Sequence, residues 1–381
     1  MKKITSFAVG ITCIVIFAIC TAVHAEKIPE ISAEHACVIE ADSGDIIFEK
    51  NANSQHEMAS TTKIMTALMA IEADCMDDIV TVSRKATLEE GSSIYLCEGD
   101  KMLMRDLIYG LMLNSGNDAA VAIAEHISGS VGQFALDMTA KAKEIGAYNT
   151  SFKNPNGLDA EGHYTTAYDL ALIARKAMQN ETFAKIAATK KGQITPINRN
   201  ETTYLSNHNR LLSMYEGVNG VKTGYTSATG RCLVSSAERN GIKIIAVTLN
   251  APDDWNDHMS MLDYAFSVCE KKMFMEKGSI VKTSKTTDGI PYSAAVAEDF
   301  SLTAVNGKAP EAEISIKIAD RLKAPISKGE KIGILNIYLR GDIIKTIDLV
   351  SDSDVVSEKN TGSKKNFLDY FLFIVHNWFM K

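Results

Sequence analysis

The sequence has no excess of positive charge. Its 381 residues include 40 lysines and arginines against 47 aspartates and glutamates, giving a formal net charge of -7. Nucleic-acid binding requires a basic surface, so this balance argues against a nucleic-acid-binding protein. It also argues against general electrostatic adhesion to an anionic membrane. There are no internal repeats, which argues against a repeat architecture. Any charge that recognises a substrate must therefore be local.

The spacing of the cysteines does not indicate a disulfide framework. Two of its seven cysteines, Cys13 and Cys20, lie in the apolar N-terminal segment. The other five have neither CxxC nor metal-ligand spacing and are Cys37, Cys75, Cys97, Cys232 and Cys269. A chain of this length can bury a core without disulfides, so we expect small, mostly buried apolar side chains.

The N-terminal apolar run, Phe7 to Cys20, is short for a full bilayer span. Lys2 and Lys3 precede it, and Val23-His24-Ala25 places small residues where a signal peptidase cleaves. We therefore expect residues 1–25 to be a signal peptide cleaved after Ala25, with an uncleaved anchor as the alternative. Cleavage removes two lysines and no acid, which changes the formal charge from -7 to -9.

The order of elements predicts an α+β first domain over residues 26–275. An apolar hairpin spans the Asp42–Asp45 turn, and helical periodicity follows from Ser60 to Ala73 and over most of Met102 to Met178. Three short strands and a closing helix come next, at Gly220–Thr223, Cys232–Ser235, Lys243–Leu249 and Met259–Val268. We expect one antiparallel sheet, joined by the N-terminal hairpin, with helices packed on it.

A small all-β domain is predicted over residues 276–352, where apolar and polar residues alternate, as at Ile314–Ile318. Residues 353–381 are predicted to be a linker and an amphipathic helix. The helix, Phe367–Lys381, would be roughly 22 Å long, which is short for a bilayer span. It fits a position in the membrane interface, and docking on the protein's own core is the alternative.

Three short elements could carry chemistry. Ser60 and Lys63 are three residues apart on a predicted helix, so a desolvated lysine could activate the serine hydroxyl. Alone, the pair is also typical of helix capping and a solvated charge. Ser115-Gly116-Asn117 precedes a helix and is by itself typical of a loop.

The third element, Lys222-Thr223-Gly224, lies on a predicted strand. Its lysine and hydroxyl could bind a carboxylate, and Gly224 would allow a ligand or another backbone to approach closely. In isolation, an exposed strand with a surface lysine explains it equally well.

Taken together, in this order and in helix, loop and strand contexts, the three elements resemble the active-site set of penicillin-binding proteins and serine β-lactamases. The surrounding residues 59–67, 113–119, 156–159 and 220–226 are similar to those of the low-molecular-mass D-alanyl-D-alanine carboxypeptidases. The likeness extends over almost the whole mature chain. It implies a β-lactamase/transpeptidase-like domain with a five-stranded antiparallel sheet, helices on both faces and a helical subdomain. A small β-sandwich-like domain and an amphipathic C-terminal helix would follow.

The resemblance implies a function: removal of the terminal D-alanine from peptidoglycan stem peptides ending in D-Ala-D-Ala. Ser60 would be the nucleophile, Lys63 its base, and Ser115 the relay of a proton to the leaving D-alanine. Asn117 would hold the substrate backbone or keep Lys63 in place. Lys222 and Thr223 on the Gly224 strand would hold the carboxylate, and the backbone N–H groups of Ser60 and Tyr225 would form an oxyanion hole. β-Lactams would acylate Ser60, and no metal or organic cofactor would be required. The protein would act on the outer face of the cytoplasmic membrane, held there by its C-terminal helix.

Two alternatives remain open. A class A β-lactamase would need a deacylating glutamate after the second element, and Glu161 lies in that stretch without the expected Glu-x-x-Leu-Asn context. A penicillin-binding protein without catalysis is the other alternative, although every candidate catalytic group is present.

Overall fold

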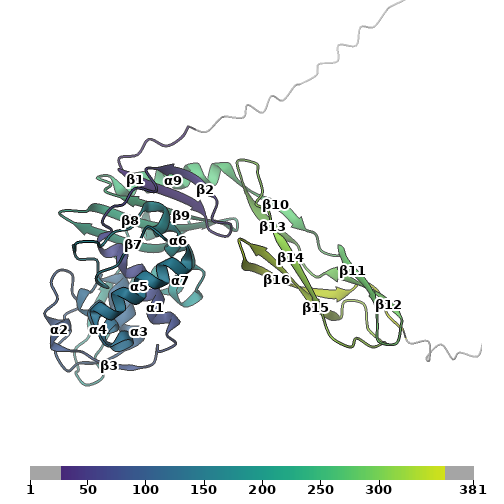
Figure 1. Cartoon of the computed structure of the whole chain (residues 1–381), viewed down its shortest axis with the longest axis horizontal. Coiled ribbons are helices and arrows are strands. Elements are labelled where there is room, and N and C mark those ends of the chain that lie inside the picture. Colours follow the sequence, from purple (N-terminus) through teal and green to yellow (C-terminus); the bar gives the residue numbers. More distant parts are fainter. Residues whose placement is uncertain (1–26, 357–381) are drawn as a thin grey trace, which may run out of the picture.

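The computed structural model describes residues 27–356. The predicted signal peptide and the predicted C-terminal helix lie outside the described residues. Figure 1 shows a first domain of mixed helices and strands and an elongated second domain made of strands. Within residues 27–356, no helix combines the length and the apolarity needed to cross a bilayer.

The first domain is built on a five-stranded antiparallel sheet with the order β2-β1-β9-β8-β7. Its strands are β1 (His35–Glu40), β2 (Ile46–Lys50), β7 (Val218–Thr226), β8 (Gly230–Arg239) and β9 (Ile242–Leu249). The N-terminal hairpin joins the three later strands, which confirms the predicted sheet. β7 forms one edge, so its outer side has no strand partner among the described residues.

Both faces of this sheet are covered because side chains alternate along each strand. On β1, Cys37 and Ile39 join the large core under the helices, whereas Ala36 and Val38 pack in a second core with Met261 of α9 (Asp254–Val268). The predicted helices on both faces are therefore confirmed.

The remaining helices of the first domain lie between β2 and β7 in the sequence. They are η1 (Ala59–Thr62), α1 (Lys63–Glu72), α2 (Arg84–Thr87), α3 (Met104–Leu113), α4 (Asn117–Ser128), α5 (Val131–Ile145), α6 (Ala167–Met178), α7 (Glu181–Ala188) and α8 (Leu211–Met214). Two short hairpins accompany them: β3 (Ile79–Thr81) with β4 (Lys101–Leu103), and β5 (Lys191–Ile194) with β6 (Thr203–Ser206). Ser130 caps α5 by accepting a hydrogen bond from the backbone N–H of Gln133, and Gly146 ends that helix in a left-handed conformation.

The second domain is all β, as predicted. Its strands are β10 (Cys269–Met275), β11 (Ile280–Lys285), β12 (Pro291–Val296), β13 (Phe300–Val305), β14 (Glu313–Ile318), β15 (Lys331–Leu339) and β16 (Asp342–Ser351). A five-stranded sheet has the order β11-β12-β16-β15-β14, and β10 pairs separately with β13. Since its ladder partner belongs to the second domain, β10 joins that domain ahead of the boundary expected at residue 276.

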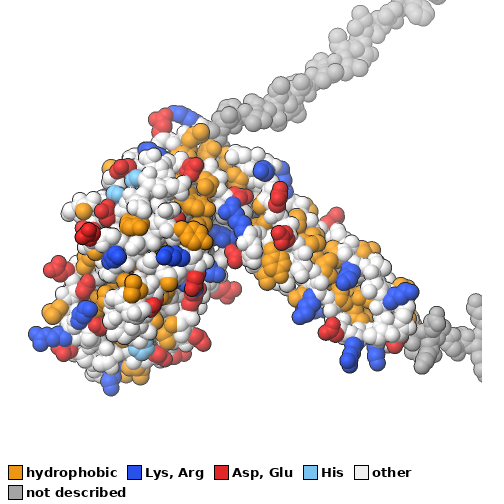
Figure 2. Space-filling model, viewed as in Figure 1, with side chains coloured by type: hydrophobic (Ala, Val, Ile, Leu, Met, Phe, Trp, Pro, Cys, Tyr) orange, Lys and Arg blue, Asp and Glu red, His pale blue; other side chains and the backbone are white. Residues whose placement is uncertain are grey.

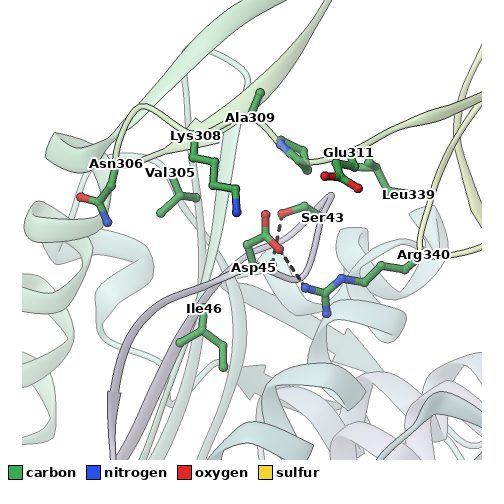
Figure 3. Close-up of a pocket in the computed structure, with 11 residues that line it drawn as sticks. Ser43, Asp45, Ile46, Val305, Asn306, Lys308, Ala309, Glu311, Leu339 and Arg340 are labelled. Atoms are coloured by element: carbon green, nitrogen blue, oxygen red, sulfur yellow. Dashed lines mark hydrogen bonds and ion pairs between the residues drawn. The ribbon is translucent and has the colours of Figure 1, made fainter.

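Two crossed ion pairs connect the domains. Arg340 of the β15–β16 turn lies 2.8 Å from Asp45, and Arg175 of α6 lies 3.4 Å from Asp342. Figure 3 shows the first pair at the wall of a cavity of about 690 Å³, which Lys308 and other residues of both domains also line. Figure 2 shows the second domain projecting from the first at an angle. Apolar contacts join the domains as well, because Cys269 of β10 and Val305 of β13 belong to the same buried cluster as Met261 of α9.

The five cysteines outside the apolar N-terminal segment form no disulfides within the described chain. Cys37, Cys232 and Cys269 are buried, Cys75 is half-buried and Cys97 is exposed. The expectation of small, mostly buried thiols is confirmed for three of the five.

Candidate active site

Ser60 and Lys63 meet at the start of the first long helix. Ser60 lies in the 3₁₀ turn η1, and Lys63 is the first residue of α1, so the α-helix begins three residues later than predicted. A 3₁₀ turn has three residues per turn, which places residues i and i+3 directly above one another. Nζ of Lys63 lies 2.9 Å from Oγ of Ser60, within hydrogen-bond distance.

Lys63 is fully buried, with 0% of its surface exposed. Its Nζ also donates a hydrogen bond of 2.5 Å to the backbone carbonyl of Asn156. Burial holds the pKa of Lys63 well below its usual range, and the charge of Lys222 lowers it further, while Asp118 and Glu89 oppose the shift. The amine beside Ser60 can therefore be neutral and accept a proton.

Ser115 and Lys222 form a second contact pair. Ser115 lies in the loop between α3 and α4 with a left-handed φ of 62°, and its Oγ accepts a hydrogen bond of 3.2 Å from Nζ of Lys222. Lys222 is 2% exposed, and burial lowers its pKa to about 7. A hydroxyl next to an amine that titrates near neutrality can pass a proton in either direction.

Asn117 is the first residue of α4 and is buried. Its Nδ2 donates a hydrogen bond of 2.5 Å to the backbone carbonyl of Glu90, whereas its Oδ1 is buried without a hydrogen-bond partner among the described residues. Asn117 is therefore anchored to the loop at Glu90 through Nδ2, and both of its predicted roles stay predictions.

Strand β7 passes close to the serine. A Cβ placed on Gly224 would lie 3.0 Å from the backbone nitrogen of Ser60 and 3.1 Å from the backbone oxygen of Met58. Few side chains tolerate such distances, so glycine is what lets the strand approach η1. Thr223 is half-buried on the same edge strand, and Tyr225 is 66% exposed.

Several residues that support the site were not among the predicted site residues. Asn156 contributes its backbone carbonyl, and its side chain donates a hydrogen bond of 2.6 Å to Glu89. A Cβ on Gly157, whose φ is +90°, would lie 1.9 Å from the carbonyl oxygen of Ala59. The sequence marked this loop only through turn residues and the resemblance of residues 156–159 to the family, and neither indicates which backbone group is used.

Glu161, the glutamate that a class A β-lactamase would need for deacylation, lies exposed in a turn.

The structure brings together a serine with a buried amine, a second hydroxyl with a second buried amine, and the free edge of a sheet. This arrangement suits nucleophilic attack on a carbonyl of an extended peptide that ends in a carboxylate.

Comparison with known proteins agrees with this geometry. The peptidase S11 family, described as D-alanyl-D-alanine carboxypeptidase, matches residues 21–253. The penicillin-binding protein 5 C-terminal domain matches residues 270–357. D-alanyl-D-alanine carboxypeptidase DacF of Bacillus subtilis is 38% identical over 82% of this chain and 83% of its own length.

Two solved structures are also similar. D-alanyl-D-alanine carboxypeptidase DacD from Francisella tularensis has a TM-score of 0.61 at 30% identity and covers 87% of this chain and 95% of its own. Penicillin binding protein 5 from Haemophilus influenzae has a TM-score of 0.62 at 29% identity, with coverages of 87% and 99%.

Proposed function

The chain belongs to the peptidase S11 family of D-alanyl-D-alanine carboxypeptidases, and from this premise we propose which of its residues carry out the reaction. The protein is a serine-type carboxypeptidase that removes the terminal D-alanine from peptidoglycan stem peptides and binds penicillins. The contact that supports the assignment of residues is the 2.9 Å separation of Ser60 Oγ and Lys63 Nζ in a buried setting.

In the first half-reaction, Ser60 Oγ attacks the carbonyl carbon between the two D-alanines while Lys63 takes its proton. The N–H groups of Ser60 and Tyr225 stabilise the oxyanion. As the C–N bond breaks, Ser115 relays the proton that Lys63 took to the departing amine, with the help of Lys222, and Lys63 is left neutral. Free D-alanine leaves, and the shortened peptide remains as an ester on Ser60.

Water completes the reaction. Lys63, neutral again, takes a proton from a water molecule, whose oxygen attacks the ester carbon, and Ser60 recovers its proton as the ester bond breaks. In the first half-reaction Lys222 and Thr223 hold the terminal carboxylate, which then leaves with D-alanine. In both half-reactions Asn117 contacts the substrate backbone and the peptide extends along β7. A penicillin acylates Ser60 in the same way.

The test of these roles is Ser60→Ala. The variant should lose D-alanine release from diacetyl-L-Lys-D-Ala-D-Ala by at least about a thousandfold. Mass spectrometry after penicillin treatment should place the adduct on the Ser60 peptide of the wild type and find none in the variant. Ser279→Ala, an exposed serine of the second domain, is the matched control. Persistent release by Ser60→Ala would place the nucleophile elsewhere.

The lifetime of the penicilloyl adduct on Ser60 distinguishes a carboxypeptidase from a β-lactamase. A carboxypeptidase of this kind should keep the penicilloyl group on Ser60 for a long time, because no described carboxylate is hydrogen-bonded to Ser60 to activate water there. Rapid, repeated turnover of penicillin would support the lactamase instead.

Location is part of the same proposal. Residues 1–25 direct export and are cleaved after Ala25, and the helix Phe367–Lys381 lies on the outer face of the cytoplasmic membrane. Support comes from the pattern of lysines and apolar residues alone. Cell fractionation tests it: the full-length protein should be found with membranes, and a form ending at Lys365 should be released. Equal solubility of the two forms would remove the anchor.

A further inference from the structure

The second domain presents two free strand edges. Its five-stranded sheet has the order β11-β12-β16-β15-β14, so β11 and β14 each lack a strand partner on their outer side among the described residues. An unpaired edge exposes backbone N–H and C=O groups with which another chain can pair. Proteins commonly protect such edges with a bulge or with lysines. The two edges of this sheet differ in that protection.

Strand β11 is protected against pairing with a copy of itself. Its ladder with β12 is interrupted by a register shift between Ile280 and Lys282. Lys282 and Lys285 also give the strand two charges of the same sign, both of them exposed. A bulge bends the strand, and like charges repel a second copy of it. The β11 edge is therefore unsuited to self-association.

Strand β14 has neither form of protection. It pairs with β15 from Glu313 to Ile318 without a register shift. Ile314 is 45% exposed, and Glu313 and Lys317 form no salt bridge within residues 27–356. The β14 edge is thus regular, partly apolar and carries two charges of opposite sign that have no partner in the described chain.

The hydrogen bonds to β15 show which backbone groups of β14 are free. The N–H of Ala319 donates to the carbonyl of Ile332, whereas Ile318 lies directly opposite Gly333. This pattern makes Ile318 and Gly333 a non-hydrogen-bonded pair, so the N–H and C=O groups of Ile318 point away from β15. Because the direction alternates along a strand, every second residue back from Ile318 also directs its backbone groups outward.

The sequence of β14 is self-complementary about Ser315. When two copies pair antiparallel with their serines at the centre, Glu313 of each copy lies opposite Lys317 of the other, and Ile314 lies opposite Ile316. Ile314 and Ile316 are also the residues whose backbone groups point outward, so they form hydrogen-bonded pairs in this register. The two serines meet as a non-hydrogen-bonded pair, where the chains lie closest and small side chains fit.

We infer that β14 pairs antiparallel with β14 of a second copy of this chain, about a two-fold axis at Ser315. The contact uses the same residues of both copies, as a two-fold interface requires, and joins the two second-domain sheets into one. Because the strands run along the length of this domain (Figure 1), the two first domains then lie at opposite ends of the joined sheet. No residue of β14 takes part in the reaction, so the inference is independent of the proposed function.

The first experiment measures self-association of the full chain by sedimentation over a range of concentrations. The wild type should form dimers. Glu313→Lys and Lys317→Glu each place like charges opposite one another on both sides of the axis, so each should raise the dissociation constant of the dimer at least about tenfold. The matched control is Lys282→Glu on the β11 edge, which makes the same change of charge as Lys317→Glu and should dimerise like the wild type.

The second experiment mixes the two variants. Opposite charges again meet across the axis when Glu313→Lys pairs with Lys317→Glu, so tagged Glu313→Lys should retain untagged Lys317→Glu but not untagged Glu313→Lys. Penicillin should acylate every variant at the wild-type rate, which shows that they are folded. The inference is overturned if the wild type is monomeric throughout, if the single variants dimerise as the wild type does, or if the mixed variants do not associate.

Discussion

Nζ of Lys63 is hydrogen-bonded across 2.5 Å to the backbone carbonyl of Asn156, so a distant loop holds the amine that faces Ser60. The side chain of Asn156 is in turn fixed by Glu89 at 2.6 Å. Glu89 therefore acts on Lys63 in two ways: it positions the loop, and its negative charge raises the pKa that burial and Lys222 lower. The two effects can be separated by one substitution.

Glu89→Gln should change the pH dependence of acylation. The glutamine oxygen can still accept the hydrogen bond from Asn156, but the negative charge is gone, so the pKa of Lys63 falls further. Acylation needs the neutral amine, and the rising limb of the acylation rate against pH should therefore move to lower pH. The rate of labelling by a fluorescent penicillin, measured over a series of pH values, checks this.

Glu161→Gln is the control for this shift, because Glu161 is exposed and has no part in the hydrogen bonds that hold Lys63. Its pH profile should match that of the wild type. An unmoved or upward-shifted limb in Glu89→Gln would show that the charge of Glu89 does not act on the base.

The sequence predicts those parts of the active site in which the identity of the side chain determines the role. Ser60 and Lys63 are neighbours through local helical geometry, and Gly224 marks a close approach of strand and turn. Asn156 could not be assigned a role, because it holds Lys63 by a backbone carbonyl that every residue possesses. The β5–β6 hairpin and α8 were also missed, since elements of four residues are too short to show a period.

Gly224→Ala should abolish most of the activity. The added methyl group would lie 3.0 Å from the backbone nitrogen of Ser60 and 3.1 Å from backbone atoms of Met58 and Thr61, so β7 and η1 must separate by a few tenths of an ångström at the oxyanion site. We expect a loss of about a hundredfold in acylation rate, in line with the removal of an oxyanion donor. Gly132→Ala, where nothing lies within 4 Å, should acylate normally. Wild-type acylation by Gly224→Ala would contradict the close packing.

Lys222 should set the alkaline side of the pH profile. Burial lowers its pKa to about 7, so in the free enzyme its charge is present below that pH and lost above it. Because the charge binds the substrate carboxylate, kcat/KM for diacetyl-L-Lys-D-Ala-D-Ala should fall as pH rises through about 7. Lys222→Arg keeps the charge, so this fall should disappear, whatever the absolute rate. A fall at the same pH in Lys222→Arg would assign the titration to another group.

The crossed pairs at the domain junction should fix the orientation of the second domain without affecting catalysis. Arg340→Asp places a carboxylate opposite Asp45 where an ion pair of 2.8 Å stood. We expect small-angle scattering to show a wider spread of shapes, and trypsin to cleave the junction faster. Adding Asp45→Arg restores opposite charges and should reverse both effects, although an exposed pair contributes less than about 1 kcal/mol.

Penicillin acylation should stay within about twofold in both variants, since Ser60 contacts neither residue. Identical scattering and proteolysis of the single and double variants would mean that the orientation is set by the apolar contacts of β10 and β13 instead.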